Sequence, residues 1–171
     1  RGNPDESVAF GGFPEAGRSF SSLDKERSFH KYRVVVNKEK NRILVFFVHT
    51  PTVHVYDYDG KLVAKRSFEK ADVSIEADDK IIYFESPVVI GDEVYVVHYG
   101  RSFNSLNDFS TSLIPELKVF DWEGKSTKEY KVNYPIFKIT AASNKSILAI
   151  TYDDDNPTVI CTLPSDIQLQ K

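Results

Sequence analysis

Several features that define other classes of protein are missing from this sequence. Its 171 residues include a single cysteine, Cys161, and no methionine, which excludes an internal disulfide framework and a paired-cysteine metal site. Basic residues (22) are outnumbered by acidic ones (25), so there is no basic footprint for nucleic acid. No apolar run approaches the roughly 20 residues that cross a bilayer as a helix. The usual nucleotide-loop, zinc-hydrolase and serine-hydrolase motifs are also absent, and the sequence predicts no cofactor.

The chain is instead rich in short β-strand patterns. Aromatic residues make up 13% of it, and they cluster with β-branched residues in runs that turn residues separate. Helical apolar spacing is not sustained over any long stretch. Uninterrupted apolar runs, such as 43–48 and 94–97, indicate strands that are buried on both faces. Strands are expected at 32–36, 43–48, 53–57, 62–68, 80–84, 87–90, 93–99, 117–120, 128–132, 137–141, 147–151 and 159–163.

An internal repeat organises these strands. Pro51-Thr-Val-His-Val-Tyr-Asp-Tyr-Asp-Gly-Lys61 recurs as Pro115-Glu-Leu-Lys-Val-Phe-Asp-Trp-Glu-Gly-Lys125. Both copies end in Asp-aromatic-acid-Gly-Lys, where glycine tolerates the positive φ that a tight hairpin turn demands. Without an insertion in the middle unit, the period is about 50 residues, which is within the range for four-stranded propeller blades.

We therefore predict an all-β chain, a β-propeller with about three four-stranded blades. Val55 and Val119 should hold equivalent positions in neighbouring blades. An isolated half-ring would expose an apolar blade face at each end, so we expect either a missing half of the propeller or an association of two half-rings. The expected units are a blade at 30–68, a blade at 80–132 with an insertion at 100–115, and a blade at 135–171, preceded by the tail of another blade and loop at 1–29.

Over residues 31–61 and, more closely, 91–163, the chain resembles the TolB-like six-bladed β-propeller proteins of Bacteroides and relatives. The similar stretches are Val94-Tyr-Val-Val-His-Tyr-Gly-Arg101, Lys118-Val-Phe-Asp-Trp-Glu-Gly-Lys125 and Tyr134-Pro-Ile-Phe137. The resemblance implies six blades in the full-length form, with this chain as the C-terminal half. It also implies an exported protein of the cell envelope, periplasmic or a surface-exposed lipoprotein, whose signal would precede Arg1. It carries over no catalytic residues.

The most functional-looking residues are His98, Tyr99 and Arg101, at the start of the insertion. A guanidinium beside aromatic side chains is a common means of recognising carboxylates, phosphates or sugars. We expect these three residues to line a ligand pocket beneath the insertion. The alternative is an inter-strand loop whose Phe103 and Phe109 pack over a neighbouring blade.

Other candidate residues have structural interpretations as alternatives. His49 and His98 each end the central apolar strand of their unit, where a propeller has its rim or axial pocket; a simple hydrogen-bonded histidine is the alternative. The acidic run 153–155 is either a calcium loop or a solvated hairpin, and its spacing favours the hairpin. Trp122 shares its turn position with Tyr58, which favours packing over ligand binding.

The sequence thus predicts a non-catalytic binding module of the bacterial cell envelope. It would present propeller loops to a protein, peptide or glycan partner. A propeller enzyme, such as a lactonase, lyase or hydrolase with a site built from loops of several blades, is the alternative, because fold does not choose between these functions. A structural member of a larger envelope assembly is a third possibility.

Overall fold

The computed structural model describes residues 9–16, 19–68, 80–102, 114–132, 134–142, 146–151 and 158–162. Within these ranges the chain forms strands and a short helix. The predictions for Phe103, Phe109 and the acidic run 153–155 lie outside the described residues. The elements are α1 (Leu23–Phe29), β1 (Tyr32–Asn37), β2 (Arg42–Phe47), β3 (Thr52–Tyr56), β4 (Leu62–Ser67), β5 (Ile81–Ile90), β6 (Glu93–Ser102), β7 (Glu116–Phe120), β8 (Ser126–Lys131), β9 (Ile136–Ala141), β10 (Ser146–Thr151) and β11 (Thr158–Thr162).

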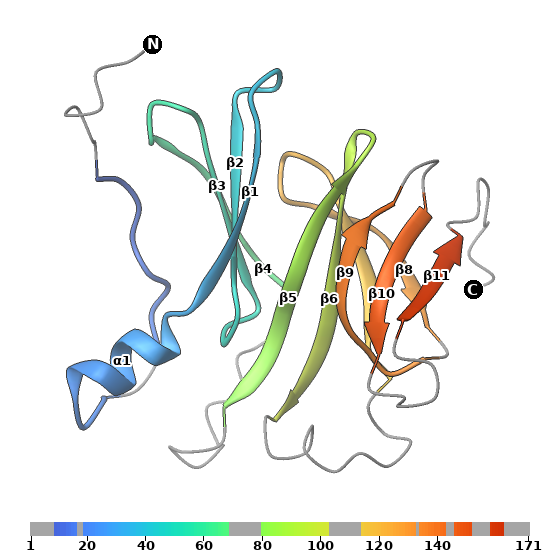
Figure 1. Cartoon of the computed structure of the whole chain (residues 1–171). Coiled ribbons are helices and arrows are strands. Elements are labelled where there is room, and N and C mark those ends of the chain that lie inside the picture. The colour runs from blue at the N-terminus through green and yellow to red at the C-terminus, as the bar shows by residue number, and fades with distance from the viewer. Residues whose placement is uncertain are drawn as a thin grey trace.

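The strands form three antiparallel sheets, which stand side by side in Figure 1. The first sheet has the order β1-β2-β3-β4 and the second β5-β6-β7-β8, while β9-β10-β11 make up the third within the described residues. Within each sheet, strands that follow one another in the sequence pair with each other. The first strand of the second sheet, β5, contacts the first strands of the other two sheets, β1 and β9. Successive meander sheets that are joined at their first strands are the blades of a β-propeller. The predicted fold class is confirmed.

Two apolar layers hold the three sheets together. In β2, Leu44 and Phe46 face the second sheet, and in β6, Val94 and Val96 face the first. Because side chains alternate along a strand, Tyr95 and Val97 of β6 point the other way. They belong to a second apolar layer, which lies between the second and third sheets. The central strand β6 is therefore covered by a sheet on both faces, whereas β2 has a described sheet on one face only. Most residues of the two apolar runs, 43–48 and 94–97, are nevertheless buried, as the sequence predicts. The first layer contains Leu44, Phe46, Val53, Val55, Tyr83, Phe84, Val94, Val96, Phe120 and Trp122. The second contains Tyr95, Val97, Leu117, Val119, Ile136, Ile139, Ile147 and Ala149.

The repeated turn has the same geometry in both copies. Gly60 and Gly124 have φ of +77° and +72°, as the sequence predicts. The carboxylate of Asp121 accepts hydrogen bonds from the N–H groups of residues 123 and 125, at 3.0 and 2.8 Å. Asp57 accepts the matching pair at 3.1 and 2.9 Å. The turn therefore depends on its aspartate as well as on its glycine, and Val55 and Val119 lie at equivalent positions of β3 and β7.

A short helix precedes the first sheet, in a region that the sequence predicts to be mostly loop. Ser22 caps α1, and its hydroxyl accepts from the N–H of Lys25 at 3.3 Å. The helix has 7 residues, which is too short for an apolar repeat to be visible in the sequence. Its last residue, Phe29, is buried.

Truncation of Leu44 to alanine should destabilise the fold by about 2–5 kcal/mol, because a buried side chain leaves a cavity in the first layer. The measurement is the free energy of unfolding by urea. Leu62, an exposed residue of β4, is the matched control, and Leu62→Ala should change stability by less than about 0.5 kcal/mol. Equal losses in the two variants would contradict the assignment of this core.

Replacing Asp121 with alanine should cost about 1 kcal/mol, since two turn N–H groups lose their acceptor and water replaces it only in part. Asp121→Asn keeps an acceptor oxygen and should lose less. Asp57→Ala provides an internal comparison, because the first turn has the same bonds. The measurement is the urea concentration at the midpoint of unfolding. Equal midpoints for Asp121→Ala and the unmodified chain would show that glycine alone specifies the turn.

Candidate functional site

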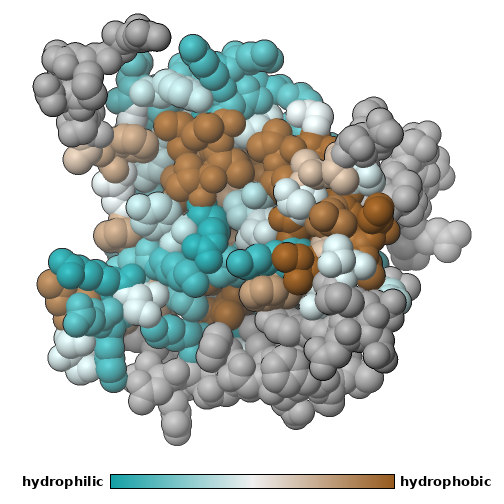
Figure 2. Space-filling view, viewed as in Figure 1, coloured by the Kyte–Doolittle hydropathy of each residue, from teal (hydrophilic) through white to brown (hydrophobic). Residues whose placement is uncertain are grey.

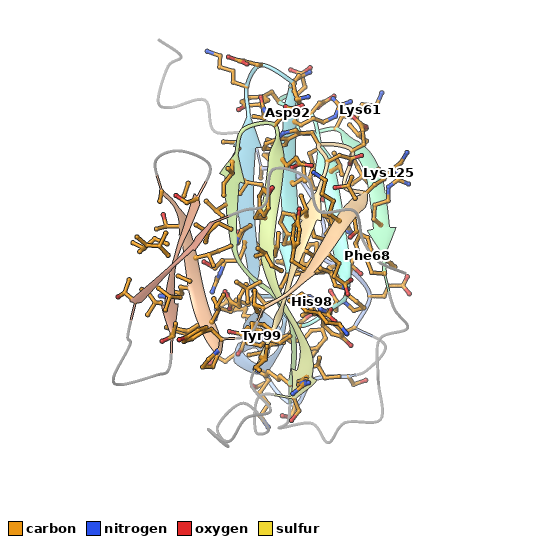
Figure 3. All side chains as sticks on the ribbon, turned by 90° about the vertical axis from the view of Figure 1, so that its right-hand side faces the viewer. Lys61, Phe68, Asp92, His98, Tyr99 and Lys125 are labelled. Atoms are coloured by element: carbon orange, nitrogen blue, oxygen red, sulfur yellow. The ribbon has the colours of Figure 1, made fainter. Side chains whose placement is uncertain are left out.

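The three residues that the sequence singles out lie near the end of β6, but not in one pocket. The ring of His98 packs between the first two sheets, with centroid distances of 5.5 Å to Phe84 and 6.4 Å to Tyr83. Tyr99 points to the third sheet, where its hydroxyl donates to the carbonyl of Ile136 at 2.8 Å. Arg101 is exposed. Figure 3 shows His98 and Tyr99 on different sides of their strand.

The reason for this separation is the alternation of side chains along a strand. Two consecutive residues of a strand that is packed on both faces cannot line one cavity. The sequence pattern shows which residues are neighbours in the chain, but not that His98 and Tyr99 enter different inter-sheet layers. A role of Arg101 in ligand binding stays a prediction.

The environment of His98 favours the neutral imidazole. The residue is 5% exposed, and burial lowers its pKa to about 4, an effect to which the nearby Lys118 adds. Nδ1 lies 3.4 Å from Oε2 of Glu116, yet burial outweighs this attraction. Gly100, with φ of +60°, follows closely, and a Cβ there would lie 3.2 Å from the imidazole Cε1. The histidine therefore serves as a tightly packed part of the layer between the sheets.

A polar pocket lies where the first and second sheets meet, at the end where β1 and β5 begin. Its volume is about 310 Å³. The backbone around it is fixed, because Val48 N–H donates to the carbonyl of Lys31 at 2.9 Å and Tyr83 N–H donates to the carbonyl of Val48 at 2.8 Å. We call it the inter-sheet pocket. Its lining consists of Ser28, Lys31, Val48, His49, Lys80, Ile82 and Glu85.

Cations outnumber carboxylates among the described residues of this pocket. Glu85 is held by Arg33 through two bonds, 2.7 Å from Nε and 3.0 Å from an amino nitrogen. The Lys31 ammonium lies 3.6 Å from the same carboxylate, and Lys80 donates to the Ser28 hydroxyl at 2.6 Å. The Arg33 guanidinium and two ammonium groups thus lie around a single described carboxylate, so the described charged groups at the pocket are net positive.

His49 gives the pocket a neutral acceptor. Its Nδ1 lies 2.7 Å from the carbonyl oxygen of Ile81; since a carbonyl only accepts, Nδ1 carries the proton, and Nε2 is the acceptor of the neutral ring. Burial lowers the pKa of His49, and Lys80 and Lys31 lower it further. The sequence places His49 at the end of a central strand, but gives no sign that Lys31 and Lys80 lie beside it.

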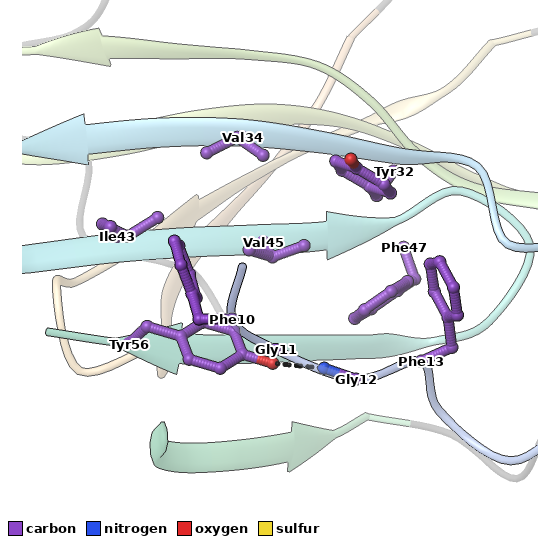
Figure 4. A pocket seen from close by; sticks show the side chains of 10 residues that line it. All are labelled: Phe10, Gly11, Gly12, Phe13, Tyr32, Val34, Ile43, Val45, Phe47 and Tyr56. Carbon is purple, nitrogen blue, oxygen red and sulfur yellow. Dashed lines mark hydrogen bonds between the residues drawn. The ribbon is translucent and has the colours of Figure 1, made fainter. Parts of the chain in front are cut away.

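A second cavity is an apolar groove on the far face of the first sheet, turned away from the second sheet (Figure 4). Its volume is about 480 Å³. Residues 10–13 cross it in an extended path, and Gly12 N–H donates to the hydroxyl of Tyr56 at 3.3 Å. Phe10 and Phe13 remain about half exposed. The groove is lined by Phe10, Gly11, Gly12, Phe13, Tyr32, Val34, Ile43, Val45, Phe47 and Tyr56.

Within the described part of the chain, no group of three or more histidine, cysteine, aspartate or glutamate side chains is arranged to hold a metal ion. The same residues include no helix with the length and apolar character to cross a membrane.

No family model and no curated protein matches this chain. Among solved structures it is similar to the β-propeller domain of Cps50 (Swd1) from Myceliophteria thermophila, with 14% sequence identity and a TM-score of 0.45. The match covers 83% of this chain and 40% of that one.

The low pKa of His98 predicts an acid-dependent loss of stability. The ring is neutral in the folded chain down to about pH 4, whereas the unfolded chain binds a proton near pH 6.5. The unfolded state therefore binds more protons between these values, and stability falls as the pH falls through this window. Between pH 7.5 and 4, the unmodified chain should lose about 3 kcal/mol more than His98→Gln. A ring titration by NMR near pH 6.5 would contradict this assignment.

Proposed function

We propose that this chain is part of a non-catalytic binding module that holds an acidic group of its partner in the inter-sheet pocket. The observation that carries this proposal is the convergence of Lys31 and Lys80 on a cavity in which the one carboxylate among the described residues, Glu85, is bound by Arg33 through two hydrogen bonds. Charge-assisted bonds from ammonium groups suit a carboxylate or a similar anion. The neutral Nε2 of His49 would accept a hydrogen bond from a neighbouring hydroxyl.

A carboxylate next to hydroxyl groups is the chemistry of an acidic sugar, and a cavity of about 310 Å³ suits a small ligand group. We therefore propose an acidic glycan as the partner. The position of the pocket supports the choice, because β1 and β5 are the first strands of their sheets and contact each other, as do the strands around the central channel of a propeller. Ligands reach such a channel without disturbing the blade cores.

The wider setting of the module is proposed from the sequence resemblance to TolB-like propellers. We propose a six-bladed ring in the full-length form and a place in a bacterial cell envelope, either periplasmic or as a surface lipoprotein. A protein of the envelope would meet the acidic glycans that the pocket is proposed to take.

The test is calorimetric binding of short uronic-acid oligosaccharides and of their carboxyl-reduced, neutral counterparts. The acidic forms should bind, and Lys31→Ala and Lys80→Ala should each weaken binding at least about tenfold, which corresponds to a lost charge-assisted bond. Lys38→Ala is the matched control, since this exposed lysine lies beyond the other end of β1. Binding that the pocket variants leave unchanged, or equal binding of the neutral sugars, would overturn the proposal.

A further inference from the structure

The face of the first sheet that carries the apolar groove has no sheet packed against it in the described part of the chain. We call it the open face. Its exposed apolar residues include Val34 and Val36 of β1 and Tyr32 at the start of that strand. Figure 2 shows hydrophobic surface over the upper part of this sheet, above a hydrophilic band. Exposed apolar surface of this kind marks an interface.

The open face matches, position by position, the face that the second sheet uses to dock onto the first. Ile43 pairs with Tyr56 across β2 and β3, and Val94 pairs with Phe120 across β6 and β7. Two residues further along the second strands are Val45 and Val96. In the second sheet these positions are completely buried against the first sheet. The first sheet thus carries a docking surface of the same pattern.

The turn aromatics show what the open face lacks. Trp122 of the second sheet is 3% exposed and belongs to the layer between the first two sheets. Tyr58 holds the same place in the matching turn of the first sheet and is 44% exposed. The two turns have the same backbone hydrogen bonds, so the difference comes from the neighbouring sheet that packs on Trp122 and that has no counterpart at Tyr58 among the described residues.

Residues 10–13 indicate what kind of neighbour belongs there. A Cβ added to Gly124 would lie 2.7 Å from Cγ2 of Val55, on β3 of the preceding sheet. A Cβ added to Gly60 would lie 2.6 Å from Cβ of Phe10. Phe10 therefore takes, against the first sheet, the place that a third-strand valine takes against the second. The groove beside it lies where the inner strands of a preceding sheet would pack.

We propose that the open face docks a preceding four-stranded blade of the same ring, of which residues 10–13 hold an outer position. The groove would receive the alternating apolar side chains of that blade's first and second strands. This inference rests on the ring arrangement proposed above, but not on the acidic ligand, so that either can fail alone.

A second copy of the chain is the competing occupant. The first two sheets present apolar pairs to the sheet that follows them, Val35 opposite Leu44 and Val88 opposite Tyr95. On the outer face of the third sheet, Thr140 lies opposite Leu148. On the other side of β10, however, Leu148 lies opposite Ile160, which is 71% exposed, so the labelling test below has to separate a second copy from a preceding blade.

The test compares the labelling of an engineered cysteine by a maleimide reagent in two forms of the protein. Tyr58→Cys, in a Cys161→Ser background, is placed in the product of the intact gene, expressed in its own cells, and in the purified 171-residue chain. Labelling in the intact product should be about tenfold slower or more, since a docked blade hides the site. Val34→Cys, in the groove, is a second probe if the first variant fails to fold. Leu62→Cys, an exposed position of β4, should be labelled equally in both forms.

Equal labelling of Tyr58→Cys in the two forms would overturn the proposal, because the open face would be uncovered in the intact product. Protection in the 171-residue chain that grows with concentration and accompanies a doubled mass would identify a second copy as the occupant and overturn it too. Protection in the monomeric 171-residue chain would have the same effect, because the chain would then cover the face by itself.

Discussion

The apolar layer between the first and second sheets is the contact on which the rest of this structure depends. At its centre the rings of Phe46, Phe84 and Phe120 meet edge to face, with centroids 5.1 to 5.8 Å apart. One ring comes from the first sheet and two from the second, so the contact fixes both the distance and the register between blades. Edge-to-face aromatic packing adds a preferred geometry to the burial of area.

The polar features follow from this contact. Because the layer brings β1 beside β5, the residues that flank these strands, Lys31 and Lys80, meet although they are far apart in the sequence. The Arg33–Glu85 pair spans the same boundary. The inter-sheet pocket is thus a consequence of blade packing, and it uses side chains that neither sheet could assemble alone. A ligand bound there would contact two blades at once.

The same packing rule explains the unequal faces of the first sheet. A blade with apolar residues on both sides needs a neighbour on each side. Among the described residues, the second sheet has both, whereas the first has one sheet and the segment 10–13, in which Phe10 and Phe13 are about half exposed. The groove and the exposed Tyr58 are the two signs of this inequality. The inter-sheet pocket lies at the interface that the first and second sheets form. The open face has the same pattern of apolar residues, but no described sheet packs on it.

Much of the fold could be predicted from the sequence, because the information is local. The Asp-aromatic-acid-Gly-Lys repeat specifies a hairpin, and the unbroken apolar run of β2 requires cover on both faces. Helix α1 could not be predicted, since a helix of 7 residues, about two turns, is too short to show a periodic apolar pattern. The candidate site was beyond sequence reasoning for a different reason. Adjacency in the chain suggested that His98 and Tyr99 act together, but strand alternation sends them into separate layers.

The sequence by itself determined most of the strands, the repeat, the turn chemistry and the need of each blade for neighbours. It was wrong in dividing β5, because the strands expected at 80–84 and 87–90 are one irregular strand, Ile81–Ile90. The features that it determined depend on residues within a few positions of one another and on the alternation of apolar side chains. Only the tertiary structure decided which face of the first sheet is covered and which remains open, and that Lys31, His49 and Lys80 share a pocket. The physical reason is that these outcomes depend on packing between sheets, which brings together residues that no local pattern relates.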